Sequence, residues 1–341
     1  MLRRIALCAL PVLLLATACT QAKSPDASGT QSTSSSASTT PTNSGSASTS
    51  GSTSASSTPT PTKTTTKPAA PTKAVHVSLL ENDGGVYGVG MPIIAWFNVA
   101  PTDAHAFSAA TKVTQNGVAV PGKWYFESTA HAGAALEAHW RPASYWKGHS
   151  AIHLDLPVKG LSAGPGLAYD DSLTLDMSTG TAIISTVSAI SLRMTVTVDG
   201  KPYGTFPVSL GANNTPTARG TKVIMEKGAD ISMRGPGYFD AHVKWTQRLT
   251  YGGEYLHAAP WNCTVGSGCT GPANNIGHLS TSNGCTNLVP GTAEQLYNLM
   301  KIGDVVQFPD ANGPAMTMGA GYGDWNVPWS QWVTGGALKT T

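Results

Sequence analysis

The feature that most constrains the fold is a succession of short apolar runs, rich in β-branched and aromatic residues and separated by glycine and proline. Such runs predict strands, because an amphipathic helix needs a longer stretch with a period near 3.6 residues. Within residues 75–180 the runs recur at roughly regular spacing, which is typical of a β-sandwich. No Cys…Trp…Cys framework accompanies them, so an antibody-type domain is not expected. The strand candidates are Pro92–Asn98, Lys123–Phe126, Ala135–Trp140 and Ala151–Val158.

A second β-rich part is predicted for residues 181–310. Apolar and polar side chains alternate through residues 192–198, which indicates a strand with one buried face. Asp199 and Gly200 follow, a pair that strongly favours a two-residue hairpin turn, and residues 203–210 would form the returning strand.

One clear helix is expected near the end of this second part. Thr292–Gln295 match a capping box, and apolar residues follow at helical spacing. Lys301 would close the last turn and Gly303 would end the helix, before a strand at residues 305–308.

The N-terminal segments are not expected to join a folded core. Two arginines, a short apolar run and small residues ahead of Cys19 are typical of a signal peptide at residues 1–19. Cys19 stands where lipoprotein signals are cut, so we expect it to carry lipid. An ordinary cleaved signal is the alternative, because Ala16 occupies the position that usually holds leucine. Residues 20–74 are rich in Ser, Thr and Pro and predict a disordered tether.

Charge and export narrow the classes of function. The formal net charge is +2, so no basic surface for nucleic acid is predicted. The expected location is the outer face of the cytoplasmic membrane, in the cell wall, with membrane contact through lipid on Cys19. An exported chain is in an oxidising compartment, where an odd cysteine is either a partner for another chain or a reactive thiol.

Two stretches carry candidate chemistry: Tyr255–Trp261, which contains His257, and Ser282–Leu288, which contains Cys285. A thiolate is a strong nucleophile, and an imidazole can take the thiol proton. Gly284 lacks a Cβ, so a carbonyl could approach the backbone there, and the N–H groups of Gly284 and Cys285 could hold an oxyanion. Residue chemistry alone leaves this a candidate, because a lone Cys and a lone His occur together in many sequences.

These stretches resemble the catalytic domain of the L,D-transpeptidase (YkuD-type) family, in particular its actinobacterial members with Ig-like modules. The family motif is His-Ser-Ala-Pro-Trp followed by Ser-His-Gly-Cys-x-Asn. The resemblance extends from about residue 76 to the end of the chain, through Arg219–Met225, Gly323–Trp329, Trp140–Pro142 and Tyr145–Lys147.

The resemblance implies a mainly β protein: an Ig-like β-sandwich at residues 75–180 and a β-rich catalytic domain with one or two helices at residues 181–310. A Trp-rich tail at residues 311–341 would pack on both. Its tryptophans, Trp325, Trp329 and Trp332, would pack the tail between the two domains.

The resemblance also implies residue roles. Cys285 would be the acylated nucleophile and His257 the base. Gly284 would contribute oxyanion donors with Cys285. Around them, Ser282, Asn283 and Asn287 would shape the site, and Ala258, Trp261 and one flap aromatic, Tyr238 or Phe239, would contact substrate.

Three departures from the family pattern stand out. Asn283 replaces the motif histidine and Ala258 replaces the motif serine. The spacing from His257 to Cys285, 28 positions, is widened by an insertion that contains Cys263 and Cys269.

The activity implied is cysteine-dependent acyl transfer on peptidoglycan stem peptides, forming 3→3 cross-links through a thioester. It needs no metal or organic cofactor, and carbapenem β-lactams would acylate the same cysteine. Two alternatives stay open: an L,D-carboxypeptidase with water as acceptor, and an inactive wall-binding lipoprotein.

The remaining cysteines and His278 also have competing interpretations. Cys263, Cys269, His278 and Cys285 offer four zinc-type ligands, but their spacings do not match common zinc motifs. We therefore expect a Cys263–Cys269 disulfide with Cys285 free. His278 lies only seven positions before Cys285, yet it occurs in a stretch without periodicity, so His257 is the preferred base.

Overall fold

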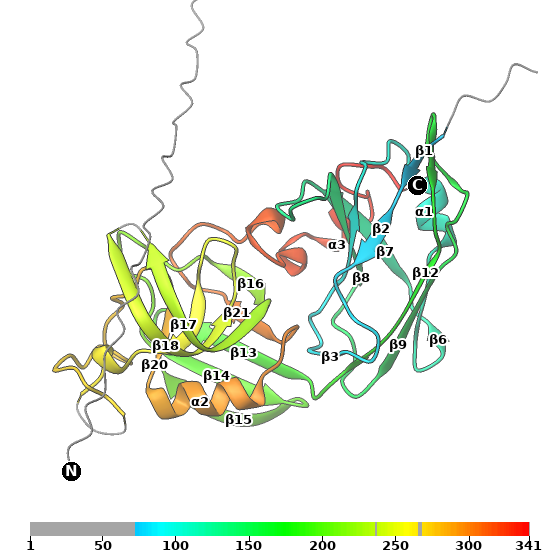
Figure 1. Cartoon of the computed structure of the whole chain (residues 1–341). Coiled ribbons are helices and arrows are strands. Elements are labelled where there is room, and N and C mark those ends of the chain that lie inside the picture. Colours follow the sequence, from blue (N-terminus) through cyan, green and yellow to red (C-terminus); the bar gives the residue numbers. More distant parts are fainter. Residues whose placement is uncertain (1–71, 236, 265–267, 341) are drawn as a thin grey trace, which may run out of the picture. The chain divides into compact units, whose positions relative to one another are not determined.

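The computed structural model describes residues 72–340, apart from residue 236 and residues 265–267 (Figure 1). The expected signal peptide at 1–19, the lipidation site Cys19 and nearly all of the tether at 20–74 lie outside the described residues. Strands dominate the described chain, so the mainly β fold predicted from the sequence is confirmed. No helix among the described residues is long and apolar enough to span a membrane.

The first part of the described chain is a β-sandwich with one core. Its apolar side chains, among them Phe97, Trp124 and Leu154, are fully buried between two sheets. One sheet contains, in spatial order, β2 (Val77–Leu79), β4 (Ile93–Phe97), β8 (Leu136–Pro142) and β7 (Gly122–Glu127). The other contains β3 (Val86–Tyr87), β12 (Leu173–Thr179), β9 (Ala151–Leu156), β5 (Lys112–Gln115) and β6 (Val118–Ala119).

Two smaller features complete the sandwich. A three-stranded sheet contains β1 (Lys73–Val75), β11 (Leu167–Tyr169) and β10 (Ser162–Gly164). The short helix α1 (His105–Ala110) has no counterpart among the predictions, and it buries Phe107 against the aromatic core.

The second part combines two sheets and a helix around another core. One sheet contains β15 (Lys201–Pro207), β14 (Arg193–Val198), β13 (Ile183–Ser188), β21 (Val305–Phe308) and β16 (Gly220–Val223). The other contains β17 (Glu226–Gly235), β18 (Tyr238–Arg248), β19 (Tyr255–Ala258) and β20 (Thr286–Leu288). The predicted hairpin joins β14 to β15. Its turn residues Asp199 and Gly200 have φ values of 49° and 75°, the left-handed conformation that a type I′ turn requires.

The predicted helix is present, but both of its predicted ends were wrong. Helix α2 (Pro290–Leu299) begins with Pro290, whose fixed φ suits the first helical position, and Thr292 does not cap it. It ends at Leu299, two residues before Lys301. Leu296 and Ala293 are buried and anchor the helix against β18 and β19.

The C-terminal tail contacts both parts through named side chains. In η3 (Asp324–Asn326), the Asn326 amide accepts from Thr221 N at 2.8 Å and donates to Thr221 O at 2.7 Å. In α3 (Trp329–Trp332), the Trp332 indole donates to Lys123 O of the sandwich at 2.8 Å. The Arg141 guanidinium lies over the rings of Trp325, Trp329 and Trp332. A further short helical turn, η2, covers Met318–Ala320.

Candidate functional site

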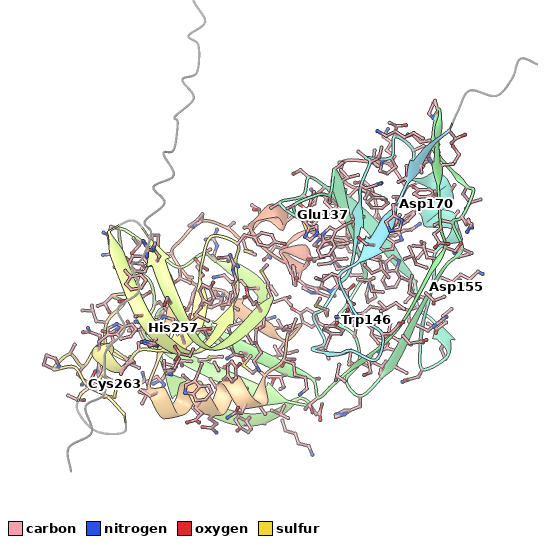
Figure 2. All side chains as sticks on the ribbon, viewed as in Figure 1. Glu137, Trp146, Asp155, Asp170, His257 and Cys263 are labelled. Carbon is pink, nitrogen blue, oxygen red and sulfur yellow. A yellow bond between two sulfur atoms is a disulfide. The ribbon has the colours of Figure 1, made fainter. Side chains whose placement is uncertain are left out.

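Parallel pairing of β19 with β20 brings the two motif stretches together. His257 lies opposite Asn287 in this pairing, and Cys285 immediately precedes β20. Figure 2 shows His257 on this sheet, with Cys263 in the neighbouring loop. Two segments separated by the insertion are thus fixed side by side by backbone hydrogen bonds, which is a rigid support for a reactive pair.

His257 is held as a neutral imidazole with one defined tautomer. The side chain is buried, and its Nδ1 lies 2.8 Å from the carbonyl oxygen of Ala258, to which it donates. A neutral ring that donates through Nδ1 carries its lone pair on Nε2. Burial lowers the pKa of His257 below its ordinary value, so the ring is neutral at physiological pH and Nε2 can accept a proton.

Cys285 rests as a thiol. It is the free cysteine among the described residues, it is buried, and its Sγ donates to Gly253 O at 3.5 Å. Burial raises the pKa of Cys285 to about 12, a shift opposed by a backbone hydrogen bond from Tyr255. With His257 neutral, the resting pair is a thiol and an imidazole, and the thiol proton must transfer as a substrate reacts.

A buried ion pair lies close to this thiol and was missed by sequence reasoning. The Lys222 ammonium contacts a Glu254 carboxylate oxygen and lies 3.9 Å above the Phe308 ring centre. Burial lowers the pKa of Lys222 and the Glu254 carboxylate opposes that shift. The Glu254 charge raises the pKa of Cys285 and the Lys222 charge lowers it. The one signal in the sequence was Lys222 itself, a lysine in the otherwise uncharged strand β16 (Gly220–Val223), and it does not identify Glu254 as the partner.

The two motif residues line one cavity of about 180 Å³. Of the two flap candidates, Tyr238 lines this cavity, and its pKa is raised by burial and by the nearby Cys285. Phe239 does not line it; 55% of its surface is exposed and it packs against Arg234. The cavity is lined by Met233, Tyr238, Asp240, His257, Trp261, Asn262, Thr281, Ser282, Asn283, Cys285 and Asn287.

The loop before β20 differs from the oxyanion site that was expected. Gly284 has φ of 107°, a conformation that favours glycine. Its N–H donates to Ser282 Oγ at 3.2 Å, and that hydroxyl donates to Cys285 O at 2.6 Å. In this state the Gly284 N–H is therefore engaged, and only a rearranged loop would present it to an oxyanion.

The other predicted site residues divide into those at the cavity and one in the core. Asn287 is buried at the cavity, and its Oδ1 has no hydrogen-bond partner among the described residues. Asn283 is exposed at the rim, and Trp261 is 41% exposed. Ala258, expected to contact substrate, is instead in the apolar core, and its contribution is the carbonyl that orients His257.

The insertion carries a disulfide and holds His278 away from the cavity. Cys263 and Cys269 are joined with a Cα–Cα separation of 5.4 Å. His278 is exposed in a turn and does not line the cavity that contains Cys285. Among the described residues, the only group of His, Cys, Asp and Glu side chains close enough to hold a metal lies elsewhere, at Glu127, Glu137 and His139.

Comparisons with known proteins identify two families along the chain. Residues 183–308 match the L,D-transpeptidase catalytic domain family (YkuD), and residues 20–162 match the bacterial Ig domain family. L,D-transpeptidase 2 of Mycobacterium tuberculosis is 30% identical over 278 residues, which cover 79% of this chain. The match covers 64% of that relative, so this chain spans less than two thirds of its length.

Solved structures give the same picture of the fold. A crystal structure of L,D-transpeptidase 3 from M. tuberculosis with a faropenem-derived adduct has a TM-score of 0.53 and 26% identity. It covers 70% of this chain and 98% of that one. A structure of an LD transpeptidase in complex with imipenem has a TM-score of 0.55 and 24% identity, with coverage of 70% and 100%.

Proposed function

The chain belongs to the L,D-transpeptidase family, and we propose that it transfers the acyl group of a peptidoglycan stem peptide through a thioester on Cys285. The observation that carries this proposal is the shared cavity of Cys285 and His257, in which the ring is neutral and its Nε2 is the proton acceptor. The two substitutions in the motif, Asn283 and Ala258, leave Cys285 and His257 in place. Asn283 is at the rim of the cavity, and the backbone carbonyl of Ala258 orients the His257 ring. These features argue against the inactive wall-binding alternative.

In the first step, Cys285 Sγ attacks the carbonyl carbon of the third residue of a tetrapeptide stem. Because the pKa of the thiol is about 12, the thiol proton moves to His257 as the carbon–sulfur bond forms. His257 then returns the proton to the leaving nitrogen, and the C–N bond breaks to release D-Ala. The product is a thioester, with no change in oxidation state.

In the second step, the side-chain amine of a neighbouring stem attacks the thioester. His257 takes the amine proton, the carbon–sulfur bond breaks, and the thiol is restored with a new 3→3 amide bond. A second cavity, of about 600 Å³, shares Met233, Tyr238 and Asn283 with the catalytic cavity. Two adjoining cavities support separate binding of donor and acceptor stems, and hence transpeptidation over hydrolysis.

Product analysis tests the proposal. The protein would be incubated with a tetrapeptide-bearing muropeptide, and the products identified by mass spectrometry. Transpeptidation predicts released D-Ala and a dimer of the mass of a 3→3 linkage, both absent with Cys285→Ser. Tripeptide without dimer would instead identify water as the acceptor, and no release of D-Ala would contradict the proposal.

We further propose that lipid on Cys19 tethers the protein to the outer face of the cytoplasmic membrane. The support is the signal sequence ahead of Cys19. Mass spectrometry of the N-terminal peptide from membranes should show an acylated Cys19, and Cys19→Ala should release the protein from the membrane fraction. A cleaved, unmodified N-terminus in the wild type would contradict this proposal.

A further inference from the structure

A second buried polar cluster lies in the sandwich, outside the catalytic cavity. Glu127 of β7 and Glu137 of β8 are directly opposite in the antiparallel pairing, and His139 follows two residues after Glu137 on the same face of the sheet. The exposed fractions of the three side chains are 12%, 6% and 1%. Two carboxylates facing each other in a buried sheet repel, and a cation between them would relieve that repulsion.

The facing atoms lack hydrogen bonds. His139 Nε2 and Glu127 Oε1 are buried and have no hydrogen-bond partner among the described residues. Nε2 lies 3.6 Å from Glu137 Oε1 and 4.0 Å from Glu127 Oε1, which is too long for hydrogen bonds. Two ligand atoms that each lie 2.0–2.2 Å from one tetrahedral ion are about 3.4 Å apart. This is close to the 3.6 Å between His139 Nε2 and Glu137 Oε1.

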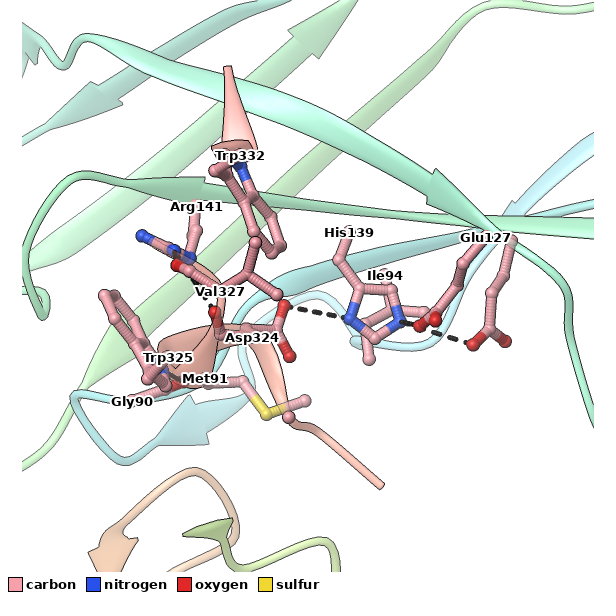
Figure 3. A network of polar contacts seen from close by, with 12 residues as sticks. Gly90, Met91, Ile94, Glu127, His139, Arg141, Asp324, Trp325, Val327 and Trp332 are labelled. Carbon is pink, nitrogen blue, oxygen red and sulfur yellow. Dashed lines mark hydrogen bonds and ion pairs between the residues drawn. The ribbon is translucent and has the colours of Figure 1, made fainter. Parts of the chain in front are cut away.

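Neighbouring groups hold the His139 ring and the Glu137 carboxylate in the way that second partners hold metal ligands. His139 Nδ1 lies 2.9 Å from Oδ1 of the fully buried Asp324, and the ring lies between Asp324 and Glu127 (Figure 3). A carboxylate on the far nitrogen of an imidazole is the usual second partner of a metal-bound histidine. Glu137 has its Oε2 bound by Thr129 Oγ1 at 2.6 Å and by the Trp96 indole at 3.3 Å, which leaves Oε1 free.

We propose that Glu127, Glu137 and His139 form a binding site for one divalent transition-metal ion, with Zn²⁺ as the best match. One imidazole nitrogen and two carboxylate oxygens suit Zn²⁺, and the fourth position would be filled by water. Asp324 is a positioning residue: it accepts from Nδ1 and so directs the lone pair of Nε2 at the ion. Since Asp324 belongs to the C-terminal tail, bound metal would also fasten the tail to the sandwich.

Zinc stoichiometry in the full chain tests the site. All variants would carry Cys285→Ser, which removes the free cysteine of the described residues as a competing zinc ligand. After exposure to ZnCl2 and removal of loose metal on a chelating resin, elemental analysis should give about one zinc per chain. Adding Glu127→Gln should reduce this to below about 0.1. The matched control, Asp176→Asn, removes an exposed carboxylate that contacts His153 in the same sandwich and should retain the zinc.

Two further readouts separate lost ligands from lost folding. Without metal, the Glu127→Gln variant should melt at or above the melting temperature of the parent, because the amide removes one of two facing carboxylates. The Asp324→Asn variant should bind zinc about 10- to 100-fold more weakly than the parent. Zinc K-edge absorption of the parent should show one imidazole with oxygen donors and no sulfur. No zinc uptake by the parent, equal uptake by Glu127→Gln and Asp176→Asn, or a sulfur ligand would each overturn the proposal.

Discussion

The catalytic cavity and the sandwich cluster each contain a histidine that is buried on a β-strand, yet the two rings differ in charge. His257 donates from Nδ1 to a neutral carbonyl, that of Ala258, and burial lowers its pKa. His139 donates from Nδ1 to a carboxylate, that of Asp324, and its pKa is raised despite equal burial. The difference shows that the charge of the partner, and not burial itself, determines which ring can act as a base.

The ionic neighbours of the two rings differ in the same way. Near Cys285, opposite charges are paired between Lys222 and Glu254, and His257 forms no ion pair among the described residues, although the charge of Asp240 in the same cavity raises its pKa slightly against burial. Around His139, three carboxylates face one ring, and His139 is the only cation that contacts them directly among the described residues. One arrangement leaves a proton acceptor for catalysis, and the other attracts a cation.

Removing one member of the buried ion pair between Lys222 and Glu254 should have the largest effect. Lys222→Met leaves the Glu254 carboxylate without its cation in a largely buried position, and we expect a loss of about 3–5 kcal/mol in the free energy of unfolding. Urea unfolding measures it.

Two controls sharpen this prediction. The double variant Lys222→Met/Glu254→Gln should recover most of the loss, because no uncompensated charge remains. Lys244→Met removes an exposed lysine that pairs with Asp230 and should change stability little. A loss in Lys244→Met as large as that in Lys222→Met would contradict the importance assigned to burial of the pair.

Exchange of the catalytic base should have the next largest effect. His257→Ala should lower the rate of Cys285 acylation by on the order of 10²-fold or more, because the variant lacks the imidazole that accepts the thiol proton. His278→Ala should change the rate by only a few-fold, since that side chain is exposed and outside the cavity. Stopped-flow measurement of acylation by imipenem compares the rates of the two variants. A larger loss of rate in His278→Ala than in His257→Ala would contradict the assignment of His257 as the base.

The pH dependence of the acylation rate tests whether the His257 ring is neutral before the reaction. The pKa of His257 lies below 6.5 and that of Cys285 is about 12, so the rate should be flat between about pH 7 and 9. It should fall only at acidic pH, about tenfold per unit below the His257 pKa, where the protonated ring cannot accept the thiol proton. A decline from pH 7 to 9 would instead indicate a thiolate–imidazolium pair at rest.

The raised pKa of His139 should make the free energy of unfolding fall as pH rises. The pKa of His139 is raised on folding, so its contribution is complete below the unfolded value near 6.5 and is lost as pH rises through the folded pKa. In EDTA, His139 alone should lower the unfolding free energy by up to about 1.4 kcal/mol from pH 7 to 8, in addition to the fall caused by buried carboxyls with raised pKa values such as Glu81 and Glu127. His139→Gln should remove the part of the slope that belongs to the ring. An unchanged slope in His139→Gln would show that the ring carries no raised pKa.

The sequence predicted the strands because their signals are local. Alternation at residues 192–198 and the Asp199–Gly200 turn each follow from a few neighbouring residues. The helix ends were wrong because Thr292 resembles a cap in isolation, whereas Pro290 already starts the helix two residues earlier.

The missed features depend on contacts between distant residues. Lys222 and Glu254 are 32 positions apart, and Asp324 is 185 positions from His139. No pattern in either neighbourhood announces such pairs. The Gly284 N–H was expected to be free, and only the loop conformation reveals that Ser282 accepts it. Long-range packing and hydrogen-bond competition therefore account for what the sequence could not predict.

Covalent modification of Cys285 tests the central claim most directly. The protein would be incubated with imipenem, its intact mass measured, and the modified peptide mapped. The account predicts a gain of one imipenem-derived group per chain, located on the peptide that contains Cys285 and absent from Cys285→Ser. An unmodified wild-type protein, or the same adduct in Cys285→Ser, would contradict the assignment of Cys285 as the nucleophile.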